Sequence, residues 1–168
     1  SPNGVRVRES RDSAANPNSL AIAVFFDVTG SMGGIPVVLQ RKLKTLMGLL
    51  VDRGYVADPQ LMFSAIGDAT CDDGPRQLGQ FESDIQMDED MSRMWLEGGG
   101  GGGGTESYEL AYYAAARHTA TDCWERRQKR GYLFTIGDEV YYPAVSVREV
   151  RELFGPTAAL TQDVPTRE

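Results

Sequence analysis

Hydrophobic residues in the first half of the chain follow a strand-helix-strand pattern. Residues 20–28 form an almost continuous apolar run, which is typical of a strand buried on both faces of a parallel sheet. After a glycine-containing turn, Pro36 stands at a plausible first helical position, and apolar residues recur at helical spacing as far as Leu50. The pattern predicts an amphipathic helix that ends at Gly54, followed by a second strand at residues 60–66.

The middle of the chain carries turn signals and a glycine run. Residues 72–75 read Asp-Asp-Gly-Pro, a turn sequence, so residues 77–81 are predicted to form a hairpin strand. Ser83 and Gln86 form a capping box that predicts a helix. Seven consecutive glycines at 98–104 predict a flexible loop, unless they are an engineered linker. The apolar residues of the predicted helix are expected in the core: Ile85, Met91, Met94 and Trp95.

Two more helices and a third strand are predicted in the second half. Alanine-rich residues 105–123 favour a helix with Tyr108 on its buried face. Residues 132–136 favour a third apolar strand. A second capping box, Ser146 with Glu149, predicts a helix that ends at Gly155.

The length and the element order indicate one α/β domain. A chain of 168 residues is long enough for a single hydrophobic core. We expect a polar N-terminal arm at residues 1–19, the domain at 20–155 and a tail at 156–168. Alternating strands and helices predict a doubly wound, mainly parallel sheet with helices on both faces.

Charge and cysteine content narrow the function classes. Asp and Glu number 24 against 17 Lys and Arg, a net charge of −7 that disfavours nucleic acids and anionic membrane surfaces. No apolar run is long enough to span a membrane. Cys71 and Cys123 have no zinc-site spacing, so a reducing compartment is the default. These features favour a cytoplasmic protein that binds neither nucleic acid nor membrane.

An acidic residue follows each of the three predicted strands. These residues are Asp27, Asp68 and Asp138, and the carboxyl ends of parallel strands lie at the edge where open α/β sheets bind ligands. Converging carboxylates repel one another unless they are protonated, screened or joined by a cation. Thr29 and Ser31 follow Asp27 at alternate positions, so one turn offers the oxygen ligands that Mg²⁺ or Mn²⁺ prefers.

At these residues the sequence resembles the von Willebrand factor A (vWA) domain, a Rossmann-like fold with a metal-ion-dependent adhesion site (MIDAS). The family motif is Asp-x-Ser-x-Ser, and here Thr29 replaces the first serine. The resemblance covers roughly residues 20–155, so the family's C-terminal strands and helix are expected to be missing from this sequence. By order and context it implies five metal ligands: Asp27, Thr29, Ser31, Thr105 and Asp138.

The resemblance also implies a function. In such a site the hydroxyls ligate Mg²⁺ or Mn²⁺ directly, the aspartates act partly through water, and an acidic side chain of a partner protein fills the open position. We therefore expect a metal-dependent protein-binding module without catalytic activity. Intracellular bacterial members of the family often act beside AAA+ ATPases of the MoxR type, which makes such a system a candidate partner.

Other acidic residues near these strand ends have two interpretations. They act in turns and caps, or they form an auxiliary cation site or an acidic rim that selects basic partners. This set comprises Asp68, Asp72, Asp73, Glu106 and Glu139.

Three alternative functions compete with the metal-site hypothesis. A vWA-like scaffold without metal would bind partners through its surface alone. A Mg²⁺-dependent phosphatase of the haloacid dehalogenase type needs a second Asp where Thr29 stands. A nucleotide-binding short-chain dehydrogenase needs Tyr-x-x-x-Lys, and the nearest match is Tyr113 with Arg117. Both enzymes therefore fit the residues less well than a binding module.

Overall fold

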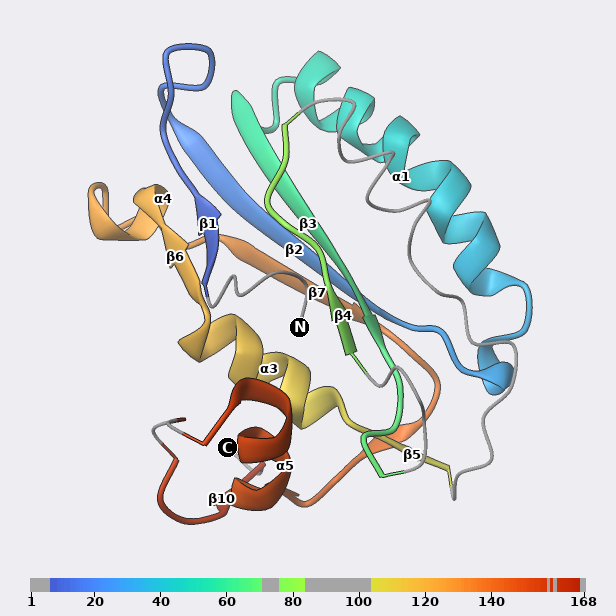
Figure 1. Ribbon diagram of the computed structural model, residues 1–168. Coiled ribbons are helices and arrows are strands. Elements are labelled where there is room, and N and C mark those ends of the chain that lie inside the picture. The colour runs from blue at the N-terminus through green and yellow to red at the C-terminus, as the bar shows by residue number, and fades with distance from the viewer. Residues whose placement is uncertain (1–6, 71–75, 84–103, 157, 159, 167–168) are drawn as a thin grey trace.

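The computed structural model describes residues 7–70, 76–83, 104–156, 158 and 160–166, which form a mixed α/β protein (Figure 1). The helices are η1 (Gly30–Met32), α1 (Ile35–Asp52), α3 (Tyr108–Arg117), α4 (Asp122–Glu125) and α5 (Val147–Phe154). The strands are β1 (Arg8–Ser10), β2 (Ser19–Asp27), β3 (Asp58–Ile66), β4 (Arg76–Leu78), β5 (Thr105–Glu106), β6 (Thr119–Thr121), β7 (Tyr132–Ile136), β8 (Val140–Tyr141), β9 (Ala144–Val145) and β10 (Val164–Pro165).

A four-stranded sheet in the order β4-β3-β2-β7 forms the centre of the molecule. β2 pairs in parallel with both β3 and β7, and β4 runs antiparallel to β3. All nine residues of β2 are buried, as its continuous apolar run predicts for a central strand. The predicted strands at 20–28, 60–66 and 132–136 are therefore confirmed, and part of the predicted hairpin strand is β4.

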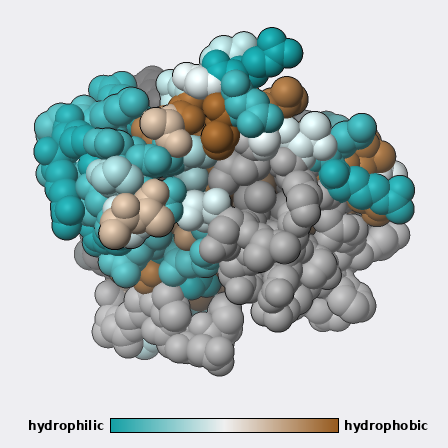
Figure 2. All heavy atoms as spheres, turned by 90° about the horizontal axis from the view of Figure 1, so that it is seen from above, coloured by the Kyte–Doolittle hydropathy of each residue, from teal (hydrophilic) through white to brown (hydrophobic). Residues whose placement is uncertain are grey.

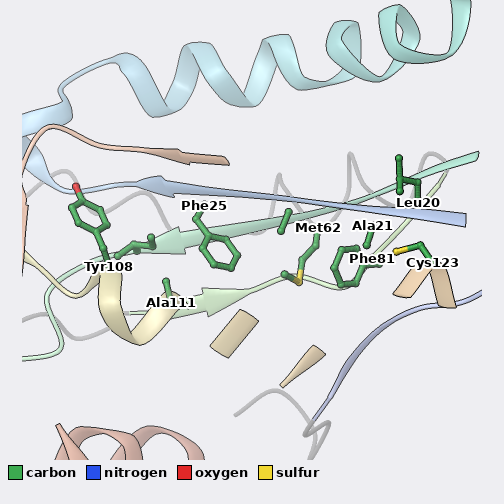
Figure 3. Packing of buried hydrophobic residues seen from close by; sticks show 10 residues of the cluster. Leu20, Ala21, Phe25, Met62, Phe81, Tyr108, Ala111 and Cys123 are labelled. Atoms are coloured by element: carbon green, nitrogen blue, oxygen red, sulfur yellow. The ribbon is translucent and has the colours of Figure 1, made fainter. Parts of the chain in front are cut away.

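The two faces of the sheet carry separate hydrophobic clusters because successive side chains of a strand point in opposite directions. On one face, Phe25 belongs to a cluster that also contains residues of β3, Ala111 of α3 and Cys123 of α4. Figure 3 shows this cluster, with Tyr108 at one end and Cys123 at the other. On the opposite face, Phe26 belongs to a cluster contacted by residues of α1. Helices therefore cover both faces, as expected.

Helix α1 follows the predicted amphipathic pattern. It begins at Ile35, with Pro36 in its first turn, and ends at Asp52. Gly54 follows with φ of 66°, a left-handed conformation that glycine adopts without steric cost. Several apolar side chains of α1 are exposed, Val38 and Leu49 among them. In Figure 2, a view from above Figure 1, apolar atoms in brown reach the surface between polar groups.

The prediction of one helix over residues 105–123 is wrong. Thr105 and Glu106 form β5, α3 ends at Arg117, and β6 and α4 follow. Tertiary pairing overrides helix propensity here, because β5 pairs with β8 and β6 pairs with β1 of the N-terminal arm. The arm is held further by Arg11, whose guanidinium donates to Asp122 at 2.9 Å.

Strand β7 is less buried than its apolar sequence predicts. Tyr132, Leu133 and Phe134 are 55%, 44% and 53% exposed. One edge of β7 pairs with β2, and no described strand pairs with its other edge. An apolar groove of about 490 Å³ is lined by residues of α1, β2 and β7. Among the described residues, no helix is long and apolar enough to cross a membrane.

The C-terminal part confirms one cap and adds one strand. Ser146 accepts a hydrogen bond from the backbone N–H of Glu149 at 3.5 Å, as the capping box predicts for α5. No strong element is expected after Pro156, yet β10 pairs antiparallel with β9. The helix predicted after Ser83 and most of the glycine run lie outside the described residues.

Candidate functional site

The register of the sheet brings three strand ends to one edge. Asp27 lies beside Ile66 of β3, and Phe26 lies beside Ile136 of β7. Each of these isoleucines is followed by Gly-Asp, so Asp68 and Asp138 leave the sheet at the same edge as Asp27. The predicted convergence of the three strand ends is therefore confirmed.

Asp27 and Thr29 form a buried turn at the centre of this edge. The Oδ1 atom of Asp27 accepts hydrogen bonds from the backbone N–H of Thr29 at 2.8 Å and from its hydroxyl at 2.6 Å. Asp27 is 0% exposed, and Thr29 is also buried. Ser31 follows in η1, although its side chain lies outside the described atoms. The turn therefore fixes the first two residues of the predicted ligand motif.

Tyr108, in the first turn of α3, completes the surroundings of Asp27. Its hydroxyl donates to Oδ2 of Asp27 at 2.8 Å. A Cβ atom on Gly137 would lie 2.0 Å from the Tyr108 oxygen, so only glycine leaves room for the phenol. Burial, and then the hydrogen bond to Asp27, raises the pKa of Tyr108 above its usual range.

Thr105 and Asp138 come from two segments that run side by side. Thr105 of β5 pairs with Val140 of β8, two residues after Asp138. Gly104, at φ of 71°, precedes this pair, and a Cβ there would lie 3.2 Å from the Glu139 carboxylate. Thr105 is half-buried and Asp138 is exposed. The pairing thus brings both predicted ligands to the edge where Asp27 lies.

A second turn of the same kind lies at Asp68. Oδ1 of Asp68 accepts from both the backbone N–H and the hydroxyl of Thr70 at 2.8 Å, and the Tyr142 hydroxyl donates to Oδ2 at 2.9 Å. Ser107 joins this turn to α3, because its hydroxyl accepts from Ala69 N–H at 2.9 Å. These bonds are those expected from the turn interpretation of Asp68.

The other residues of the predicted acidic rim differ in environment. Glu106 is buried and Glu139 is half-buried. Asp72 and Asp73 lie outside the described residues.

One buried carboxylate near this edge was not predicted. Glu109 is 1% exposed, and none of the described residues forms a hydrogen bond with its Oε1 atom. Its Oε2 atom accepts from the backbone N–H of Tyr142 at 3.3 Å. Burial raises the pKa of Glu109 to about 7. Glu149 on α5 also has a raised pKa, caused first by burial and further by the charge of Asp68.

The donor set fits a small, hard cation if hydroxyl oxygens take part. Among the described residues, no three Asp, Glu, His or Cys side chains are grouped so that they could hold a metal ion. The predicted set has two carboxylates, Asp27 and Asp138, and three hydroxyls. Because the Thr29 hydroxyl donates its proton inward to Asp27, a lone pair on its oxygen can face a cation. Oxygen ligands without nitrogen or sulfur suit Mg²⁺ or Mn²⁺.

Sequence reasoning missed the side chains that hold the two aspartates. Tyr108 was expected only as a core residue, whereas its hydroxyl contacts Asp27. Tyr142 and Ser107 were not singled out, although both contact the turn at Asp68. The available signal was Gly137 before Asp138, because a glycine at a strand end can mark a close approach by another group.

Comparison with known proteins identifies no family for this chain. No family model matches the sequence, and no curated protein matches it. The functional argument therefore rests on the residues and geometry of the sheet edge.

Proposed function

We propose that this chain binds one divalent cation, Mg²⁺ or Mn²⁺, at the carboxyl edge of its sheet and uses the cation to bind an acidic group of a partner protein. The proposed ligands are Asp27, Thr29, Ser31, Thr105 and Asp138.

The arrangement of Asp27 and Thr29 is the main support for this proposal. A buried carboxylate at a strand end accepts the proton of the nearby Thr29 hydroxyl at 2.6 Å, so the lone pairs of that hydroxyl point away from Asp27. The pairing of β5 with β8 adds Thr105 and Asp138 from neighbouring segments. A cation held largely by neutral hydroxyls keeps more of its positive charge than one held by carboxylates, so it can attract an anionic ligand.

The element order also supports a vWA-like fold. A central strand ending in Asp-x-Thr-x-Ser, two parallel neighbours and one antiparallel edge strand agree with the resemblance noted in the sequence. In that case the chain is a binding module rather than an enzyme. The proposed partner carries an exposed Asp or Glu, and a cytoplasmic AAA+ ATPase system of the MoxR type is one candidate.

Thermal unfolding with and without metal tests the proposal. The protein is first measured in EDTA, then with millimolar Mg²⁺, Mn²⁺ or Ca²⁺. A ligand present at 100 times its Kd stabilises the native state by about 2.7 kcal/mol, which is roughly 5–10 °C in Tm for a chain of this size. We expect this rise in the wild type and its loss in Asp27→Asn.

Asp52→Asn provides the matched control. Asp52 is an exposed carboxylate at the C-terminal end of α1, so its variant should keep the full response to metal. An equal rise in both variants would indicate weak binding elsewhere on the acidic surface. If no metal raises the Tm of the wild type, a scaffold that binds partners without metal becomes the better explanation.

A further inference from the structure

The carboxylate of Asp27 has little capacity left for a cation. A carboxylate offers about four lone-pair positions, two on each oxygen. Two donors from Thr29 occupy Oδ1, and the Tyr108 hydroxyl occupies one position on Oδ2. Among the described residues, one position on Oδ2 therefore remains. Asp27 can contact a cation through that single position or through a bridging water, but it cannot chelate the ion with both oxygens.

The Tyr108 hydroxyl also connects the two loops that carry the proposed aspartate ligands. It donates to Asp27 after β2 and lies against Gly137, the residue that follows β7. The phenol is buried and occupies the space left by the missing side chain of Gly137. One hydroxyl on α3 thus fixes the orientation of Asp27 relative to the loop of Asp138.

We propose that Tyr108 is a positioning residue that fixes the direction in which the open position on Oδ2 of Asp27 faces and thereby favours Mg²⁺ over Ca²⁺ at the site. This inference rests on the proposed metal-binding function. Ca²⁺ takes six to eight oxygen ligands and accepts carboxylates that bind with both oxygens, whereas Mg²⁺ requires octahedral geometry and keeps several waters. A carboxylate held in place by three protein donors suits the coordination of Mg²⁺ better than that of Ca²⁺. Loss of the phenol hydroxyl removes the bond that orients Oδ2, while Thr29 still holds Oδ1. Mg²⁺, with its strict octahedral geometry, should then lose more affinity than Ca²⁺.

Isothermal titration calorimetry with Mg²⁺ and Ca²⁺ measures the predicted selectivity. The proteins are the wild type, Tyr108→Phe and, as the matched control, Tyr112→Phe on the same helix, where the side chain is 42% exposed. Partners that orient a metal ligand typically contribute 10–100-fold to affinity, so we expect Tyr108→Phe to lower the ratio of Mg²⁺ to Ca²⁺ affinity about tenfold. Tyr112→Phe should leave the ratio unchanged.

Gly137→Ala gives an independent test that keeps the hydroxyl. The new methyl group would lie 2.0 Å from the Tyr108 oxygen, so the phenol must move away from Asp27. The selectivity ratio should fall in the same direction as in Tyr108→Phe. In protein labelled with ¹³C at Cζ of tyrosine, the Tyr108 resonance is the one missing from Tyr108→Phe. The Tyr108 resonance should shift when Mg²⁺ is added, because Asp27, which accepts the hydrogen bond of the phenol, then also faces the cation.

The possible results separate this inference from the proposed function. If the wild type binds Mg²⁺ and Tyr108→Phe keeps the wild-type ratio, the role of Tyr108 is refuted and the metal site stands. An equal fall in Tyr112→Phe would also refute it, because that hydroxyl is exposed. If the wild type binds neither ion and the Tyr108 resonance does not move, both the inference and the proposed function are refuted.

Discussion

The buried carboxylate of Glu109 predicts an unusual dependence of stability on pH. Glu109 lies in the first turn of α3. Among the described residues, its Oε1 atom has no hydrogen-bond partner, and Oε2 accepts from the backbone N–H of Tyr142 at 3.3 Å. Glu149 of α5 adds further negative charge nearby. These surroundings favour the protonated form, so replacement by the isosteric neutral amide, Glu109→Gln, should remove a destabilising charge at neutral pH.

The magnitude follows from the two pKa values of Glu109. In the folded protein the pKa is about 7, against an ordinary value of 4.5. Because one pKa unit corresponds to 1.36 kcal/mol, this carboxyl group lowers the free energy of unfolding by roughly 3 kcal/mol once it is ionised in both states. The folded state binds the extra proton, so the stabilisation is complete below about pH 4.5 and is lost as the pH rises through 7. Glu109→Gln should lack this loss.

Urea unfolding at pH 5, 6, 7 and 8, followed by circular dichroism, measures the effect through linear extrapolation. The difference in unfolding free energy between Glu109→Gln and the wild type should grow in favour of the variant by about 2–3 kcal/mol between pH 5 and pH 8. Glu152→Gln on α5 is the control, because that exposed carboxylate lies 3.6 Å from Arg148 of the same helix. We expect the corresponding difference in unfolding free energy to change by less than about 0.5 kcal/mol. Parallel curves for Glu109→Gln and the wild type would refute the reasoning.

Two further predictions concern the arm and the backbone. Arg127→Ala removes the donor 2.6 Å from Asp12 that holds the pKa of that carboxyl near 2. The variant should be less stable than the wild type at pH 7, and its free energy of unfolding should fall less between pH 4 and pH 2. Acid titration followed by circular dichroism measures both differences. Gly131→Ala should destabilise by about 2 kcal/mol, because its Cβ would lie 2.6 Å from the carbonyl oxygen of Ala21. Gly48→Ala in α1 has open space and should stabilise by about 0.5–1 kcal/mol; equal Tm shifts in the two glycine variants would contradict this contrast.

Local sequence determines much of the central fold. The apolar run of β2, the helical spacing of α1 and the capping box of α5 each correspond to the predicted element. These signals succeed because burial on two faces, burial on one face and a cap each require a recognisable residue pattern. The convergence of Asp27, Asp68 and Asp138 follows for the same reason, since parallel strands that end in an acid place those acids at one edge.

Long-range pairing decides what local patterns cannot. Residues 105–123 have an alanine-rich helical pattern, yet Thr105–Glu106 and Thr119–Thr121 form strands because β8 and the N-terminal arm supply partners. Likewise, the sequence predicts an apolar strand at 132–136, whereas the exposure of β7 depends on which strands lie beside it. The partner strands β8 and β1 lie far along the chain from the segments with which they pair, so local sequence patterns do not reveal them.

The proposed site divides in the same way. The turn from Asp27 to Ser31 can be predicted from the sequence, because its residues lie close together in the chain and their spacing limits the geometry. Packing of distant segments places Tyr108 against Asp27 and leaves room for the phenol at Gly137. The same packing buries Glu109, with an Oε1 atom to which no described residue donates. Those contacts join residues far apart in the chain, and their energies depend on distance and burial, which exist only once the strands and α3 have packed together.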